Sequence, residues 1–101
     1  MTQFEWTVPA DHASLAGHFP GHPILPGVVL LDRLQLGLAA AGIRVSEISN
    51  AKFSSPALPG ETLIFSAQPQ STGSLSFRID CGDRTIASGT LRITMLGTTS
   101  T

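Results

Sequence analysis

Hydrophobic residues repeat with a helical period in the second quarter of the chain. Between Gly27 and Ala41 most positions are apolar, and leucines at positions 30, 34 and 38 recur about once per helical turn. Pro26 and Gly27 are typical of a helix start, and Gly42 can adopt the left-handed conformation that ends a helix. The pattern predicts a helix from about Gly27 to Ala41. Because apolar residues nearly encircle it, we expect the rest of the protein to wrap this helix.

Elsewhere every second residue tends to be apolar, which is the period of a half-buried strand. Aromatic and β-branched residues alternate with polar ones from Phe4 to Val8, and Pro9 follows them. The same alternation returns after the helix. It predicts four more strands, at residues 47–53, 62–68, 74–81 and 85–96.

Glycine and proline mark the expected breaks between these strands. Residues 56–61 form a predicted turn, Pro69 ends the strand before it, and Gly82 supplies the positive φ of a short hairpin. Gly89, inside the last strand, predicts a bulge or a strong bend. One helix followed by consecutive strands favours an α+β fold in a single domain, residues 1–101.

The composition predicts a buried surface beyond the fold of one chain. Hydrophobic residues make up 42% of the sequence and charged residues 13%. A chain of this length buries only about 60 to 65% of its unfolded surface when alone. The apolar surplus therefore predicts an oligomer interface. Small residues on the helix, Gly37 and residues 39–41, either allow a neighbour to approach closely or reflect helix propensity.

Charge and length exclude several classes of function. The net charge is −1 and the six Lys and Arg residues are scattered, so nucleic acid is not an expected partner. The longest apolar run, residues 28–31, is too short to cross a bilayer, and the first residues do not resemble a signal peptide. Cys81 is the single cysteine and allows no internal disulfide; we expect it to pack in the core. These features fit a cytoplasmic protein.

The candidate chemistry lies between His18 and Asp32. The first ten residues of this segment hold three prolines and two glycines, so they predict a stiff loop rather than a helix or a central strand. Asp32 then lies about one and a half turns into the predicted helix. An imidazole titrates near neutral pH, which suits His18 to the role of a general base. A local hydrogen bond is the alternative role of a loop histidine.

Asp32 has an unusual setting on the predicted helix. At about 100° per residue it shares a face with Val28, Val29, Leu36 and Ala39. We expect a carboxylate among these side chains to be poorly solvated, which favours its protonated form and suits a general acid near neutral pH. An ion pair with an arginine from another part of the chain is the alternative.

The three histidines, His12, His18 and His22, do not predict a metal site. Prolines and glycines between His18 and His22 prevent them from sharing one face of a helix, and no cysteine or carboxylate joins them nearby. We expect a loop hydrogen bond for His22 and no bound metal.

Two motifs carry a resemblance to a known family. The string His-Phe-Pro-Gly-His-Pro-Ile-Leu-Pro-Gly at residues 18–27, with an acid fourteen positions after His18, resembles the active-site segment of the β-hydroxyacyl-(acyl carrier protein) dehydratases. Residues 51–63 resemble the second signature of that family, a strand that ends in a Pro-x-x-Pro-Gly-(Asp/Glu) turn. Together the motifs cover about a third of the chain, in the family's order.

The resemblance implies the hot-dog fold, in which a curved antiparallel sheet wraps around one central helix and two sheets join edge to edge in a dimer. It also implies the removal of water from a β-hydroxyacyl thioester carried on the phosphopantetheine of acyl carrier protein, without another cofactor. The histidine and the carboxylate would come from opposite subunits. We expect a homodimer or a higher homo-oligomer, with a heterodimer with a paralogue as an alternative.

Elimination of water assigns roles to particular residues. His18 is the expected base, Asp32 serves the departing hydroxyl directly or through water, and the free N–H groups of Gly27 and Val28 bind the thioester oxygen. The same roles are implied by the resemblance. The remaining expected contacts to substrate come from Phe19 and Pro26.

The sequence also departs from the family pattern. The commoner dehydratases carry Glu at the position of Asp32, and Asp is typical of the branch that also isomerises the double bond. Arg33 and Leu36 replace a small residue and a glutamine, with Gln35 one position early. The chain is shorter than typical members, and short relatives also serve pathways such as aryl polyene synthesis. The alternatives are a hot-dog thioesterase, a coenzyme A-linked hydratase, or a non-catalytic subunit that pairs with an active paralogue.

Overall fold

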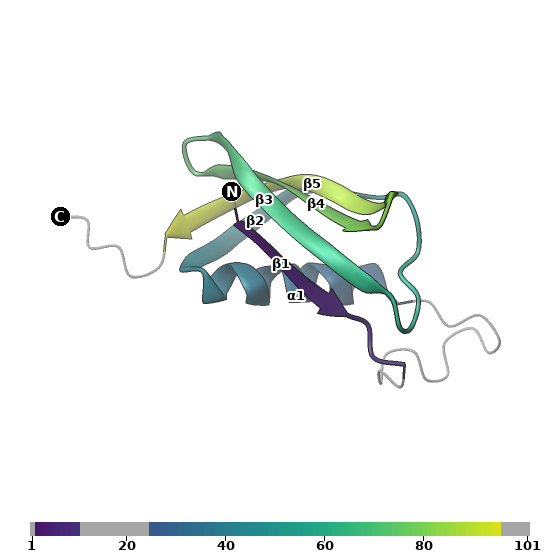
Figure 1. The fold of residues 1–101 in the computed structure, drawn as a ribbon. Helices are drawn as coiled ribbons and strands as arrows, with labels where there is room; N and C mark the ends of the chain where they lie inside the picture. Colours follow the sequence, from purple (N-terminus) through teal and green to yellow (C-terminus); the bar gives the residue numbers. More distant parts are fainter. Residues whose placement is uncertain (1, 11–24, 96–101) are drawn as a thin grey trace.

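The computed structural model describes residues 2–10 and 25–95. Its helix, α1, follows the first strand and precedes four strands in succession, and it lies against one face of the sheet (Figure 1). The elements are β1 (Thr2–Thr7), α1 (Gly27–Ala40), β2 (Ile43–Phe53), β3 (Thr62–Ser71), β4 (Ser74–Cys81) and β5 (Arg84–Met95). This is the α+β order that the sequence predicts.

All neighbouring strands are antiparallel, in the order β1-β3-β4-β5-β2. The first strand of the chain and the strand after the helix therefore form the two edges of the sheet. Apolar side chains on the face toward α1 form the core, in which Phe4 stacks on Phe65 with ring centroids 4.9 Å apart. The helix contributes the three leucines that the period predicted, Leu30, Leu34 and Leu38, and each is at most 2% exposed.

The ends of α1 agree with the local signals. The helix begins directly after Pro26, and Gly42 has a φ of 85° just beyond its C-terminal end. A left-handed φ is favourable for glycine and not for residues with a Cβ, which is why the glycine stops the helix here. In the described part of the chain, no helix is long and apolar enough to cross a membrane.

Four strands are longer or placed differently than expected, and β5 differs by only one residue at each end. β1 begins at Thr2 and ends at Thr7, β2 begins at Ile43 rather than residue 47, and β3 continues through Pro69 to Ser71. Pro69 lies beyond the β1 pairing, which among the described residues reaches only as far as Ala67. A proline is tolerated in a strand where no neighbouring strand requires its N–H.

Of the bulge or strong bend expected at Gly89, the bulge is wrong at this residue, and the bend stays a prediction. Gly89 pairs regularly with Ala51 and Phe77, and the register shifts lie at two positions of β2 and at Ile86 of β5, three residues before Gly89. A Cβ at residue 89 would collide with the backbone oxygen of Asn50 and approach the Phe77 ring to 2.7 Å. Glycine is therefore needed at this position for close packing between strands.

The sheet lies over α1, as the expected hot-dog fold implies, but the described residues leave one face of the helix exposed. The sheet lies on one side of α1 (Figure 1), and Leu30, Leu34 and Leu38 of the helix are buried. On the opposite side Val28 is 72% exposed and Leu36 is 53% exposed. Apolar residues surround the helix in sequence, but one sheet can bury only one face of it.

Candidate active site

The start of α1 presents backbone donors. Pro26 is extended, with φ −61° and ψ 144°, and its carbonyl accepts a hydrogen bond from the N–H of Val29 at 3.0 Å. Gly27 and Val28 begin the helix, and no acceptor for their N–H groups lies among the described residues. Such N–H groups, together with the helix dipole, favour a partial negative charge nearby. Binding of a thioester oxygen here is consistent with this geometry and stays a prediction.

Gly27 also fixes how closely the helix start approaches the sheet. A Cβ at this position would lie 2.8 Å from the ring of Phe53, the last residue of β2. A side chain at residue 27 would therefore require either the Phe53 ring or the first turn of α1 to move. The glycine of the Pro-Gly pair thus sets the position of the N–H groups as well as the start of the helix.

Asp32 lies on the side of α1 that faces away from the sheet, and it is exposed. Its expected burial is therefore wrong for a single chain. At 100° per residue, Asp32 lies about 160° from the middle of the buried leucine stripe. Its aliphatic neighbours are as predicted, because Val28 and Leu36 flank it on the same exposed face. Only a second surface laid on this face could desolvate the carboxyl group.

An open hollow of about 530 Å³ lies beside Asp32, between α1 and the start of β2. Gln35 and Arg44, which carry an amide and a guanidinium group, are among the residues that line it. The remaining lining residues are Leu36, Ala39, Ile43 and Val45. The hollow therefore combines a carboxyl group and polar donors with an apolar wall, which suits a partly apolar ligand with polar groups. Helical spacing could have placed Gln35 beside Asp32, but no sequence signal connects Arg44 to this site.

Several predicted site residues lie outside the described residues. They are His12, His18, Phe19 and His22. The structure therefore places Asp32, Pro26, Gly27 and Val28 but not the expected base. Among the residues that it does describe, no group of three potential metal ligands occurs.

Arg33, which departs from the family pattern, has a partner within its own chain. Its guanidinium lies 4.7 Å from the ring centroid of Trp6 on β1. A cation over an aromatic ring is a favourable contact, and it turns this side chain toward the β1 edge.

Gly37 brings α1 close to the same strand, since a Cβ there would collide with the ring of Phe4. The small residue thus allows a close approach within the chain, one of the two expected alternatives.

A second polar cluster joins the turn after β2 to the hairpin between β4 and β5. Arg84 donates from Nη2 to both carboxylate oxygens of Glu61, at 2.7 and 2.8 Å, and to the carbonyl of Pro56 at 3.2 Å. The N–H of Leu58 donates to Glu61 at 2.8 Å, and the Cys81 thiol lies 3.6 Å from the same carboxylate. Cys81 is half-buried and packs at the edge of the core rather than within it.

These contacts shift two titrations in opposite directions. Burial alone would raise the pKa of Glu61, but hydrogen bonds from Arg84 and Leu58 and the charge of Arg84 together hold this pKa below its ordinary value of 4.5. Burial and the neighbouring Glu61 carboxylate raise the pKa of the Cys81 thiol. The cluster therefore keeps a carboxylate charged beside a protonated, unreactive thiol.

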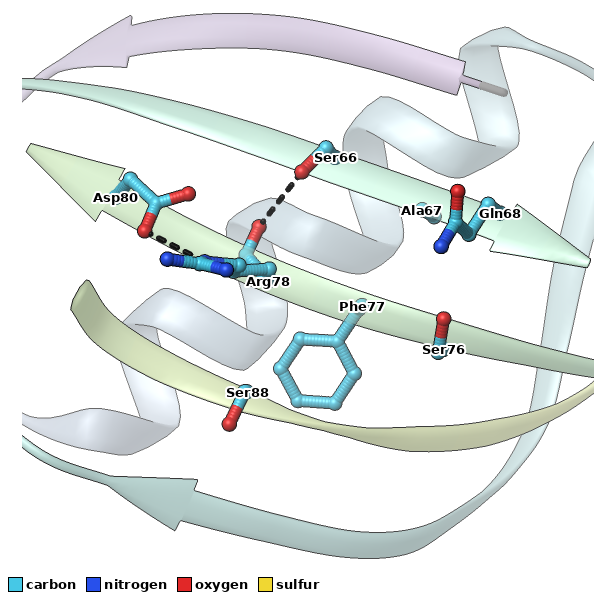
Figure 2. Close-up of a pocket in the computed structure, with 8 residues that line it drawn as sticks. All are labelled: Ser66, Ala67, Gln68, Ser76, Phe77, Arg78, Asp80 and Ser88. Carbon is cyan, nitrogen blue, oxygen red and sulfur yellow. Dashed lines mark hydrogen bonds and ion pairs between the residues drawn. The ribbon is translucent and has the colours of Figure 1, made fainter. Parts of the chain in front are cut away.

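Another hollow, of about 420 Å³, lies on the face of the sheet away from α1 (Figure 2). Arg78 crosses it, held by Asp80 at 2.9 Å and by the hydroxyl of Thr85 at 2.9 Å. Its other polar lining residues are Ser66, Gln68, Ser76 and Ser88. Figure 2 shows the helix behind these strands, so this hollow is separated by the sheet from Asp32.

Comparison with known proteins assigns the chain to a family. Residues 1–90 match the family model described as ApeI-like, the ApeI dehydratases. The chain belongs to the ApeI-like dehydratase family. Among curated relatives, the 3-hydroxyacyl-[acyl-carrier-protein] dehydratase FabZ of Wolbachia sp. subsp. Drosophila simulans is 42% identical over 65 residues, which cover 54% of this chain and 46% of the relative. The FabZ of Wolbachia sp. subsp. Brugia malayi is 32% identical over 92 residues, or 74% and 63% of the two chains. The chain spans about half the length of the first curated relatives that it matches.

Solved structures confirm the hot-dog fold expected for an ApeI-like dehydratase. An uncharacterised protein from Erwinia carotovora subsp. atroseptica superposes with a TM-score of 0.76 at 35% identity, over 92% of this chain and 82% of that one. A chain of the dehydratase heterocomplex ApeI:P from Xenorhabdus doucetiae also superposes with a TM-score of 0.76, at 29% identity. This match covers 90% of this chain and 84% of that one. The fluoroacetyl-CoA-specific thioesterase FlK superposes with a TM-score of 0.65 at 18% identity, over 94% of this chain and 89% of that one. This likeness concerns the fold alone.

Proposed function

We propose that this chain removes water from a β-hydroxyacyl thioester carried on the phosphopantetheine of an acyl carrier protein, giving the trans-2-enoyl thioester. Membership of a dehydratase family supports the reaction type. One structural observation carries the proposal: α1 presents Asp32 on an exposed apolar face, beside a hollow that can receive a ligand. Asp32 lies four residues after Val28 and five after Gly27, about 6 to 7.5 Å along the helix axis from their N–H groups.

The proposed reaction uses three groups. His18 takes the proton from the carbon beside the thioester carbonyl, and the N–H groups of Gly27 and Val28 stabilise the negative charge that develops on the carbonyl oxygen. The electron pair of the broken C–H bond forms the double bond as the C–O bond breaks. Asp32 protonates the departing hydroxyl, which leaves as water. One proton is taken up and one is given, so transfer from His18 to Asp32 resets the site without a further cofactor.

A second chain completes the site in this proposal. The exposed face of α1 combines apolar side chains with a carboxyl group, and covering that face in a dimer would remove Asp32 from bulk solvent. The resemblance to the dehydratases supports a division in which the histidine comes from the opposite subunit. A carrier protein delivers the substrate, in fatty-acid synthesis or a related pathway such as aryl polyene synthesis.

A specific observation also favours a second arrangement, in which this chain pairs with a paralogue. The similar chain from Xenorhabdus doucetiae is part of a dehydratase heterocomplex. In that arrangement the chain alone would be inactive, and the partner would supply the second half of the site. The likeness to a thioesterase does not favour hydrolysis, because it extends to the fold alone.

An activity assay on the purified chain separates these functions. We expect it to hydrate a crotonyl thioester of acyl carrier protein, which is the reverse of dehydration. The loss of the enoyl absorbance measures this reaction. Release of free thiol would indicate a thioesterase instead, and the absence of both reactions would indicate a subunit that needs a partner. His18→Ala and Asp32→Asn serve as controls, each expected to lower the rate at least about a hundredfold.

A further inference from the structure

The turn between β2 and β3 is anchored to the sheet by its two ends. At its beginning, the N–H groups of Ser54 and Ser55 donate to the carbonyl of Ile86 on β5, at 2.8 and 3.3 Å. At its end, the paired carboxylate of Glu61 and guanidinium of Arg84 hold it against the β4–β5 hairpin. Glu61 is 20% exposed and Arg84 41% exposed, so the pair is partly shielded from solvent.

This same turn holds two parts of the chain that lie on either side of the active-site segment. Val8, just after β1, donates to the carbonyl of Glu61 and accepts from the N–H of Gly60, both at 2.8 Å. Leu25, two residues before α1, donates to the carbonyl of Ala57 at 3.0 Å. Val8, Leu25 and Ala57 are at most 3% exposed, so these contacts lie in the core.

We propose that Glu61 and Arg84 are positioning residues: their ion pair fixes the turn at residues 56–61, and the turn fixes both Val8 and Leu25 around the active site. Leu25 is continuous with Pro26 and Gly27, so the turn sets the position of the helix start and of its free N–H groups. Val8 and Leu25 are therefore both hydrogen-bonded to this one turn. This inference rests on the proposed dehydratase function of that site.

The contacts explain why the turn needs its particular residues. Glu61 accepts from a backbone N–H of its own turn and from a side chain 23 positions later, so it joins a local contact to a distant one. Gly60 adopts a φ of 83° while its N–H reaches Val8, a conformation that favours glycine. The Pro-Gly-Glu sequence thus supports the start of α1 from outside the reacting groups.

Arg84→Gln tests the proposal, because the anchors at Ser54 and Ser55 remain and the chain should still fold. We expect kcat for crotonyl-carrier hydration to fall about tenfold or more, since small displacements of reacting groups are costly, while KM changes less than about twofold. Arg84→Lys should recover most of kcat by restoring a cation beside Glu61. The matched control is Arg92→Gln, which removes another β5 arginine from an exposed pair with Glu47 at 3.6 Å, and which should leave kcat unchanged.

Amide hydrogen exchange on the same variants gives a readout independent of catalysis. Exchange at the N–H groups of Val8, Gly60 and Leu25 should accelerate at least about tenfold in Arg84→Gln and stay unchanged in Arg92→Gln. If the chain has no dehydratase activity, the proposed function fails while exchange still tests the anchoring. Unchanged exchange in Arg84→Gln, or a kcat equal to that of wild type, would overturn the positioning role.

Discussion

Replacing Leu36 by serine tests whether the outer face of α1 is an interface. Leu36 is 53% exposed and follows Asp32 by one helical turn. Burying a whole leucine side chain contributes about 1.5 to 3 kcal/mol, so covering the exposed half contributes roughly 0.8 to 1.6 kcal/mol. A symmetric dimer contains the residue twice, which doubles the free energy to roughly 1.6 to 3.2 kcal/mol. Leu36→Ser should therefore weaken the dimer about 15-fold to 200-fold.

Sedimentation equilibrium over a range of protein concentrations measures this change directly. Urea unfolding at one low concentration serves as a check that each chain keeps its own stability, because Leu36 faces away from the core. The matched control is Leu58→Ser, a leucine 39% exposed in the turn after β2, where no interface is proposed. An equal dissociation constant for wild type and Leu36→Ser, or a wild type that stays monomeric at every concentration, would refute the reasoning.

Two further predictions concern the fold and its pH dependence. Gly37→Ala should lower the free energy of unfolding by about 1 to 2 kcal/mol, because the new Cβ would collide with the Phe4 ring. Alanine normally stabilises a helix relative to glycine, so the expected sign is opposite to that of helix propensity. An unchanged or higher melting temperature would contradict the packing. Since the pKa of Glu61 is lowered in the folded state, its charge stabilises the fold above the ordinary value of 4.5, and this contribution is lost as the pH falls below it. Urea unfolding between pH 7 and 3 should therefore show a shallower loss of stability in Glu61→Gln, and parallel curves would contradict the prediction.

The elements that could be predicted from sequence are those set by local signals. Pro26, Gly27 and Gly42 fix the ends of α1 within one residue, and the alternation at residues 74–81 matches β4. Pro69 was misleading because its effect depends on where β1 begins, at Thr2, more than sixty residues away along the chain. The sequence shows that Pro69 has no N–H, but it does not show whether a neighbouring strand would accept a hydrogen bond at that position.

The candidate site was less predictable because its properties depend on contacts between distant segments. The position of Asp32 among Val28 and Leu36 follows from helical spacing, whereas its exposure depends on which side of α1 the sheet covers. The contact of Arg33 with Trp6 joins residues far apart in the chain, and no local pattern announces it. The partner of Glu61 is hidden for the same reason, although the Pro-Gly-Glu turn itself is visible in the sequence.

The most direct test of the proposed active site is a mixture of two inactive variants. His18→Ala and Asp32→Asn should each be at least about a hundredfold slower than wild type in crotonyl-carrier hydration. If the imidazole and the carboxyl group come from opposite subunits, random pairing makes half of the dimers mixed, each with one intact site of two. The mixture should then recover about one quarter of the wild-type rate. No recovery on mixing, or near-wild-type turnover by either variant alone, would contradict the account.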